Sequence, residues 1–187
     1  MIDVAVLAPV LGRPASAQPL ANSLAASVRD IPCRLIFICS PGDDEEITAC
    51  RATSAAVVVV EWQPGPGDWA RKLNAVYPTV AEEWSLFAAD DLRFHPGWAD
   101  EVARVGERTN CCVVGTNDLH NVRVKAGRHS THPAVNRGYK ECGGVIDDPT
   151  RMLFEGYGHW WTDDEFVQTA MWRRPWAFAK AAHVEHL

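Results

Sequence analysis

Two neighbouring carboxylates, Asp90 and Asp91, directly follow an apolar run over residues 84–89. Such a run predicts a short buried strand, and open α/β sheets bind ligands at the carboxyl ends of their strands. Adjacent acids repel each other unless a cation or hydrogen-bond donors neutralise them. A divalent ion that carries a phosphorylated substrate would do so. The alternative is that both acids only begin a turn, a common role for aspartate.

The elements that would position these acids alternate along the first 115 residues. Apolar or β-branched runs predict strands over residues 2–8, 34–39, 57–61, 84–89 and 111–115. Helices are expected over residues 15–28, from Asp43 or Asp44 to Cys50, from an Asp68 N-cap to Tyr77, and over residues 98–105. This alternation predicts a three-layer α/β/α domain with a mostly parallel sheet. Right-handed crossovers then place the loops after the strands at one edge, which collects Arg13, Asp43, Asp44, Asp90 and Asp91.

The second half has a different pattern. Residues 116–132 are polar, without a clear period, and long for a connection inside a domain, which is typical of functional or mobile loops. Residues 133–142 are expected to form a helix that stops at Gly143 and Gly144. Thr162 precedes three acids suited to the first turn of another helix, which Pro175 would end.

Composition narrows the class of protein. A chain of 187 residues with 47% hydrophobic and 22% charged residues is expected to form one soluble domain over residues 1–187. The net charge of −6 argues against a general nucleic-acid binder. The chain has no apolar run long enough to cross a bilayer and no signal-peptide pattern, so a cytoplasmic location is expected. The six cysteines form no C-x-x-C pair and are expected to be reduced, buried thiols.

Several short motifs follow one another along the chain: PVLGRP at residues 9–14, SPGDD at 40–44, WARKLN at 69–74, ADDL at 89–92, PGW at 96–98, GG at 143–144, GH at 158–159, TDDEF at 162–166 and HVEH at 183–186. In this order they resemble the family 2-like glycosyltransferases of the GT-A fold, over nearly the whole chain. The resemblance implies a nucleotide-sugar-binding half at residues 1–115 and an acceptor-side half at 116–187. It also implies metal-dependent transfer of a sugar from a nucleoside-diphosphate sugar to a hydroxyl, with inversion.

The resemblance also implies a metal site. Ala89, Asp90 and Asp91 stand where the family carries its D-x-D element, and Ala89 departs from that pattern. Asp91 would be a metal ligand, with Asp90 directed at the ribose or a metal-bound water, and His186 would be a further ligand, with His183 as the alternative. The ion, Mn²⁺ or Mg²⁺, would stabilise the charge on the departing diphosphate.

Residues of the first half would contact the donor in this resemblance: Pro9, Arg13, Asp43, Asp44, Lys72, Asn74 and Asp90. Four of them also have a simpler interpretation. Arg13 is alternatively a solvated loop arginine, and Asp43 or Asp44 a helix N-cap. Lys72, with Arg71, is alternatively part of the solvent face of a helix.

On the acceptor side, Asp163 would be the base that takes the proton from the attacking hydroxyl, with Asp164 as the fallback. The alternative is that these acids only complement a helix dipole. Trp160 and Trp161 would form a platform for a sugar ring, or else belong to the core. Five Lys or Arg and no acid lie between Leu119 and Lys140, as a lid, as a contact for an anionic acceptor, or as a solvated loop.

Two other functions stay open on the sequence. A sugar-1-phosphate nucleotidyltransferase uses a similar sheet, but no glycine-rich phosphate loop follows the first strand. A nucleotide- or glycan-binding module without catalysis fits the degenerate Ala89 position. The acceptor, whether a glycan, a protein side chain, a metabolite or a modified nucleic acid, is not readable from the sequence.

Overall fold

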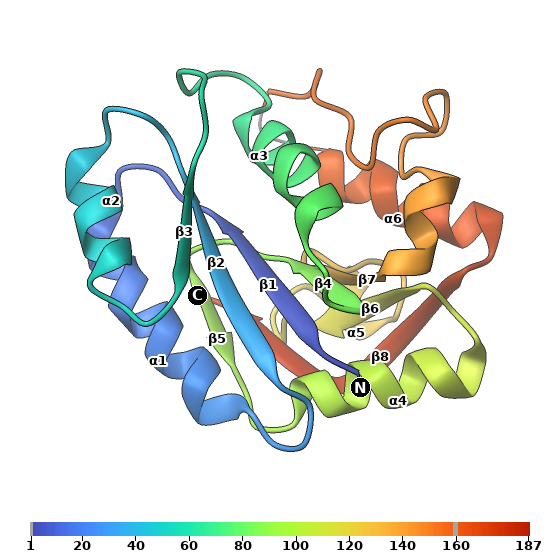
Figure 1. Ribbon diagram of the computed structural model, residues 1–187. Helices are drawn as coiled ribbons and strands as arrows, with labels where there is room; N and C mark the ends of the chain where they lie inside the picture. The colour runs from blue at the N-terminus through green and yellow to red at the C-terminus, as the bar shows by residue number, and fades with distance from the viewer. Residues whose placement is uncertain (1, 159–160) are drawn as a thin grey trace.

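A sheet of eight strands forms the centre of the computed structural model, which describes residues 2–158 and 161–187 (Figure 1). In the described chain the strands are β1 (Val4–Pro9), β2 (Cys33–Cys39), β3 (Ala56–Val59), β4 (Trp84–Phe87), β5 (Leu92–Phe94), β6 (Val113–Asn117), β7 (Pro133–Asn136) and β8 (Trp176–His186). Their spatial order is β3-β2-β1-β4-β7-β6-β8-β5. Four neighbouring pairs are parallel, and the antiparallel pairs are β4–β7, β7–β6 and β8–β5.

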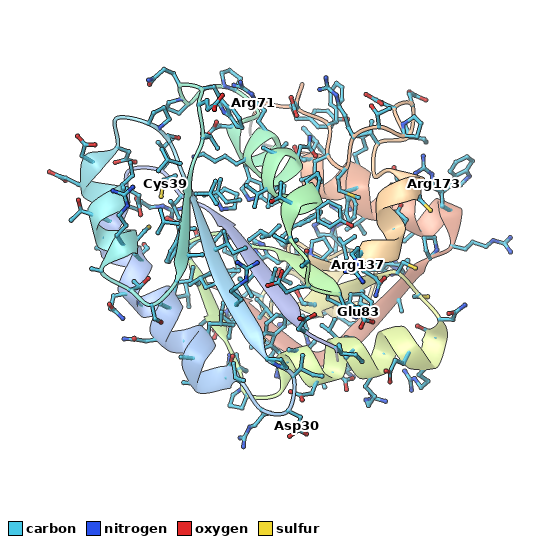
Figure 2. The ribbon with its side chains drawn as sticks, viewed as in Figure 1. Asp30, Cys39, Arg71, Glu83, Arg137 and Arg173 are labelled. Atoms are coloured by element: carbon cyan, nitrogen blue, oxygen red, sulfur yellow. The ribbon has the colours of Figure 1, made fainter. Side chains whose placement is uncertain are left out.

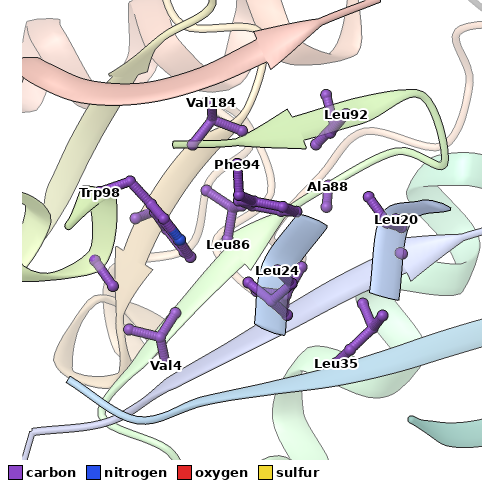
Figure 3. Close-up of a cluster of buried hydrophobic side chains, with 14 of the residues drawn as sticks. Val4, Leu20, Leu24, Leu35, Leu86, Ala88, Leu92, Phe94, Trp98 and Val184 are labelled. Atoms are coloured by element: carbon purple, nitrogen blue, oxygen red, sulfur yellow. The ribbon is translucent and has the colours of Figure 1, made fainter. Parts of the chain in front are cut away.

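Helices cover both faces of this sheet. They are α1 (Ala17–Ser27), α2 (Asp44–Arg51), α3 (Asp68–Val76), α4 (Trp98–Thr109), α5 (Val122–Lys125) and α6 (Thr162–Arg173), with 3₁₀ turns at Pro14–Ser16, Tyr77–Thr79 and Arg137–Cys142. One core lies between the sheet and α1, α2 and α4, where Trp98, Phe94 and Leu24 pack together (Figure 3). The other lies under α3 and α6, around Leu73 and Phe166. The predicted three-layer, mostly parallel architecture is confirmed.

The burial of β1 explains why the first half was predictable. Val4 and Val6 face the first core, whereas Ala5 and Leu7 face the second, because successive side chains of a strand point to opposite faces of the sheet. Both faces are covered, so the strand is apolar throughout, as parallel strands between helices are. The predicted strands and helices of this half are present, with ends that differ by a few residues.

The helix predicted over residues 133–142 is wrong. Residues 133–136 form β7 between β4 and β6, where Ala134 and Val135 are fully buried. A 3₁₀ turn follows, and the Asn136 side chain accepts a hydrogen bond from Gly138 N–H at its start. Pairing with two neighbouring strands overrides the local preference here.

Other elements were not predicted at all: β5, β8 and the short helix α5 inside the polar 116–132 segment. The expected Asp68 N-cap is also wrong by one residue, because Gly67 holds that position with a left-handed φ of 72° and Asp68 begins the helix. All six cysteines lie in the described part and are free, but only Cys39 (Figure 2) and Cys50 are buried. In the described residues, no helix has both the length and the apolar character that a membrane crossing needs.

The segment over residues 142–146 is fastened to the end of α6. Arg173, labelled in Figure 2, donates hydrogen bonds to the carbonyls of Cys142 and Gly143 at 2.7 and 2.6 Å. It also donates to Val145 at 3.2 Å. One guanidinium thereby satisfies several backbone acceptors of a segment without regular structure. This anchoring fixes α6, whose first turn enters the site described next.

Candidate active site

A cleft opens at the carboxyl ends of β1 and β4. It consists of two adjoining pockets of about 310 and 410 Å³. Both pockets are lined by Pro9, Arg13, Trp69, Asp90 and Thr162. The Trp69 indole N–H donates to the Ala88 carbonyl at 3.0 Å, which holds α3 against the end of β4.

Arg13 neutralises the acidic pair that the sequence places after β4. Its guanidinium forms an ion pair with Asp90 Oδ1, and its Nη1 lies 3.1 Å from Asp91 Oδ2. Asp90 is only 4% exposed, and burial raises the pKa of its carboxyl, against the opposing effect of Arg13. Arg13 is therefore exposed but paired, and the repulsion expected between the acids is relieved from within the chain.

The pairing of β5 with β8 brings the chain's end to Asp91. Leu92 is in register with His186, and Leu187 N–H donates to the Asp91 carbonyl at 2.9 Å. His186 Nε2 consequently lies 3.4 Å from Asp91 Oδ1. The His186 ring, together with Arg13, holds the pKa of Asp91 well below its usual range, and Asp91 in turn raises the pKa of His186.

Of the two histidines weighed on the sequence, the structure places His186 in the cleft. The His183 ring instead lies edge-on to His95, with the ring centroids 5.8 Å apart. Asp91 Oδ1 and Asp90 Oδ2 are buried and have no hydrogen-bonded partner among the described residues. A carboxylate oxygen without a donor, beside an imidazole nitrogen, is a donor set that fits Mn²⁺ or Mg²⁺.

The acids of α6 are held by the segment before β7. His129, only 2% exposed, has its Nε2 3.1 Å from Asp163 Oδ2, whereas Arg123 of α5 lies 2.5 Å from Asp164 Oδ1. Burial acts to raise the pKa of Asp163, and the His129 N–H outweighs it, so that pKa lies below its usual range. Asp163 lines the larger pocket together with Asp91 and His186, and Asp164 is not among its lining residues.

A second group of potential metal ligands lies at the start of α6. Among the described residues, only His129, Asp163 and Asp164 form a group of three potential metal ligands whose atoms all lie within 4.8 Å of one another. Arg123 already neutralises Asp164, and the His129 N–H is directed at Asp163. Asp163 Oδ2 and Asp164 Oδ1 thus already accept hydrogen bonds, whereas Asp90 Oδ2 and Asp91 Oδ1 accept none, so the Asp91 site fits a cation better.

Lys72 is not on the solvent face that the sequence allowed for it. It is 1% exposed, and its Nζ lies 2.8 Å from both the Val10 carbonyl and Asp68 Oδ2. Its neighbour Arg71 instead stacks over the Trp62 ring, 4.8 Å from the centroid. Lys72 therefore brings a buried positive charge to the wall of the smaller pocket.

Three other donor-side candidates lie outside the lining of both pockets: Asp43, Asp44 and Asn74. Asn74 exchanges hydrogen bonds with the Leu153 backbone, donating at 2.7 Å and accepting at 2.9 Å. Asp43 precedes α2 but makes no side-chain cap, and its Oδ2 accepts from Gly12 N–H at 2.7 Å.

Buried Glu46, which the sequence did not single out, accepts from Arg13 N–H at 2.6 Å. Together with Asp43, it fixes the loop that carries Arg13. Asp43 and Glu46 thus hold the loop that forms one wall of the cleft, although they do not line the cleft themselves.

His129 and His132 belong to the basic stretch, for which the sequence left open a lid, a contact for an anionic acceptor or a solvated loop, and neither had an individual role predicted for it. His132 is 4% exposed, lines the larger pocket, and has its Nδ1 3.1 Å from the Phe87 carbonyl oxygen. Burial lowers the pKa of His132 to about 4.

Trp161 precedes the first residue of α6, has a left-handed φ of 80° and is 63% exposed, so it is not a core residue. Trp160 lies outside the described residues.

A mostly parallel sheet between two layers of helices, with an acidic pair after one of its strands, is the arrangement of the GT-A glycosyltransferase fold. No protein-family model and no curated protein sequence matches the chain. Solved structures do match. Glucosyl-3-phosphoglycerate synthase from Mycobacterium tuberculosis, in complex with Mg²⁺ and uridine diphosphate, is 17% identical with a TM-score of 0.69. That match covers 100% of this chain and 72% of the other.

A second structure of that synthase, with Mn²⁺, UDP-glucose and phosphoglyceric acid, has a TM-score of 0.58 at 19% identity, over 77% of this chain and 60% of the other. S. aureus TarS, residues 1–349, has a TM-score of 0.72 at 13% identity, over 99% of this chain and 60% of the other. The chain thus spans between 60% and 72% of the length of these structures. The likeness establishes the fold.

Proposed function

We propose that this protein is a glycosyltransferase that moves a sugar from a nucleoside-diphosphate sugar to an acceptor hydroxyl, with inversion and with Mn²⁺ or Mg²⁺ bound. The observation that carries the proposal is the Asp91–His186 pair, which shares one pocket with Asp163. The M. tuberculosis structures of the same fold contain Mn²⁺ or Mg²⁺ with UDP-glucose or uridine diphosphate, which supports this choice of ligands.

In this proposal Asp91 and His186 hold the cation, which when bound offsets the charge that develops on the departing diphosphate. Arg13 keeps Asp90 and Asp91 in place, and buried Lys72 adds positive charge to the smaller pocket, where the nucleotide would lie. The acceptor oxygen forms a bond to the anomeric carbon while the bond from that carbon to the diphosphate oxygen breaks. Asp163 accepts the proton that the acceptor hydroxyl loses.

Asp163 is the base in this proposal for a geometric reason. Its Oδ2 is bound to His129, which leaves Oδ1 for a hydroxyl in the larger pocket. Asp164, paired with Arg123, lies outside the pocket lining. A cytoplasmic location remains a prediction of the same proposal, as does the division into a donor half (residues 1–115) and an acceptor half (residues 116–187).

The test measures binding and turnover with a panel of nucleotide sugars, including UDP-glucose, in Mn²⁺, in Mg²⁺ and in a chelator. Metal-dependent release of the nucleoside diphosphate is the expected result. Asp91→Asn should lower turnover about 100-fold, the size expected for losing a charge-stabilising group, and should abolish Mn²⁺ binding in electron paramagnetic resonance.

The matched control is His183→Ala, which alters a histidine three residues from His186 that faces away from the cleft. It should leave both turnover and Mn²⁺ binding unchanged. Undiminished turnover of Asp91→Asn would refute the assigned role. Pyrophosphate release from a nucleoside triphosphate would instead identify a nucleotidyltransferase, and donor binding without turnover on any acceptor would identify a binding module.

A further inference from the structure

The protonation of His132 can be read from its one polar contact. Its Nδ1 lies 3.1 Å from the Phe87 carbonyl oxygen, at the end of β4. A carbonyl oxygen only accepts, so Nδ1 carries the proton of this contact. Among the described residues no carboxylate is paired with the buried ring, and a buried charge without a partner is costly, so the ring has this single N–H and its Nε2 presents a lone pair.

That lone pair has no protein partner. Among the described residues, Nε2 of His132 is buried without a hydrogen bond, although nearly all buried polar atoms of folded proteins have one. The residue lines the larger pocket, so the unpaired atom belongs to the wall of a cavity that a ligand can enter. An acceptor in this position selects a ligand that carries an O–H or N–H group.

The position of the ring within the pocket narrows the ligand further. The His186 ring lies edge-on to it, with centroids 5.3 Å apart, and Asp163 lines the same pocket. His132, Asp91 and His186 do not form a group of three ligand atoms within 4.8 Å of one another in the described chain, so we assign the cation to Asp91 and His186. His132 lines the same pocket as Asp91 and His186 on the diphosphate side and Asp163 on the base side, and so borders the space between them.

In a sugar transferase, the group that occupies this space is the sugar that moves. We propose that His132 is a specificity-determining residue whose Nε2 accepts a hydrogen bond from a hydroxyl of the donor sugar. This inference rests on the proposed function and assigns it a further residue. A site built to bind a hydroxyl discriminates strongly against an analogue that lacks it, because the buried acceptor is then left unpaired. The transferred sugar therefore carries a free hydroxyl at this position.

Two substitutions separate the two nitrogens of the ring. His132→Asn keeps a side-chain N–H near the position of Nδ1, for the Phe87 carbonyl, and removes the acceptor at Nε2. His132→Gln keeps a polar amide near the position of Nε2 and gives up the donor at Nδ1. Calorimetry then compares uridine diphosphate with UDP-glucose, or with the nucleotide sugar of the panel that the wild-type protein binds best and its nucleoside diphosphate.

For His132→Asn, we expect affinity for the nucleotide sugar to fall about five- to tenfold, the effect of one hydrogen bond. Affinity for the nucleoside diphosphate alone should stay within about twofold, because His132 contacts only the sugar. His132→Gln should recover most of the loss. An equal loss for both ligands in His132→Asn would show a merely structural role, and no loss for either would show that the sugar does not contact Nε2; each overturns the inference and leaves the proposed function intact.

Nitrogen NMR of the histidine side chains gives a readout that needs no ligand and no substitution that affects folding. The wild-type protein should show the His132 ring protonated at Nδ1 and bare at Nε2. Protonation at Nε2 would overturn the inference directly. If the wild-type protein binds no nucleotide sugar of the panel with any metal, the proposed function fails, and this inference fails with it.

Discussion

Replacing His129 tests which acid of α6 takes the proton. His129→Leu removes the N–H that lies 3.1 Å from Asp163 Oδ2 and leaves the Arg123–Asp164 pair in place. That N–H stabilises the ionised carboxylate and lowers the pKa of Asp163. Without it the pKa rises. A hydrogen bond to a charged group contributes about 1.5–3 kcal/mol, so the ionised form of Asp163 should lose stabilisation of about that size in the variant.

The assay is the pH dependence of kcat/KM, whose acid limb reports the base of the free enzyme. In His129→Leu this limb should move to higher pH, because the base is now protonated over a wider range. The same pKa shift affects stability. A lowered pKa contributes stability above the carboxyl's unfolded pKa of about 4, and that contribution is lost as the pH falls through the folded value. The variant should therefore lose less stability than the wild type on acidification.

Arg123→Met is the matched control, since it removes the partner of Asp164 and leaves His129 and Asp163 untouched. Its acid limb should stay at the wild-type position. If the limb moves in Arg123→Met and not in His129→Leu, Asp164 is the base and the assignment of Asp163 is wrong. If neither variant moves it, neither acid takes the proton, and the reasoning from this cluster is refuted.

Two further predictions concern the walls of the cleft. Lys72→Met should lower the free energy of unfolding by about 3 kcal/mol in urea, because it leaves a largely buried carboxylate without its cation. Arg71→Met, on the same helix but stacked on a tryptophan, should cost less than about 1 kcal/mol; equal losses would contradict the buried pair. Gly67→Ala should lower the free energy of unfolding by about 1–3 kcal/mol and the melting temperature by several degrees. The reason is that φ is +72° and an added Cβ would overlap the Glu155 carbonyl. Gly65→Ala meets nothing within 4 Å, so an equal effect there would refute the steric argument.

The first half of the fold could be predicted because its signals are local. Strands β1, β2 and β4 are mostly apolar runs, and loops with proline or glycine separate them from amphipathic helices. The second half depends on pairing between distant segments. Strand β7 is held between β4 and β6, and β5 is only three residues long and forms against the end of β8. Nothing within these short segments distinguishes a strand from a helix or a turn.

The residues of the site likewise fall into those that the sequence indicated and those that only the structure reveals. The acidic pair after β4 could be located from the sequence, and the resemblance to glycosyltransferases indicated a histidine near the end of the chain. The contacts of His129 with Asp163 and of His132 with Phe87 join residues 34 and 45 positions apart. Both histidines lie in a basic stretch without periodicity, so their partners could be known only from the three-dimensional structure. Asn74 shows the opposite outcome, because its amide is used to hold Leu153.

The unpaired atoms of the larger pocket indicate what kind of ligand completes it. Within the described residues, three side-chain atoms of its lining are buried without a hydrogen bond: Asp90 Oδ2, Asp91 Oδ1 and His132 Nε2. The first two are carboxylate oxygens, and the third is bare because Nδ1 holds the ring's proton, so all three are acceptors. A phosphate alone would add further acceptors to this wall. A cation for the two carboxylate oxygens and a sugar hydroxyl for the imidazole nitrogen would satisfy all three atoms, and this is the combination that the proposed metal-bound nucleotide sugar brings.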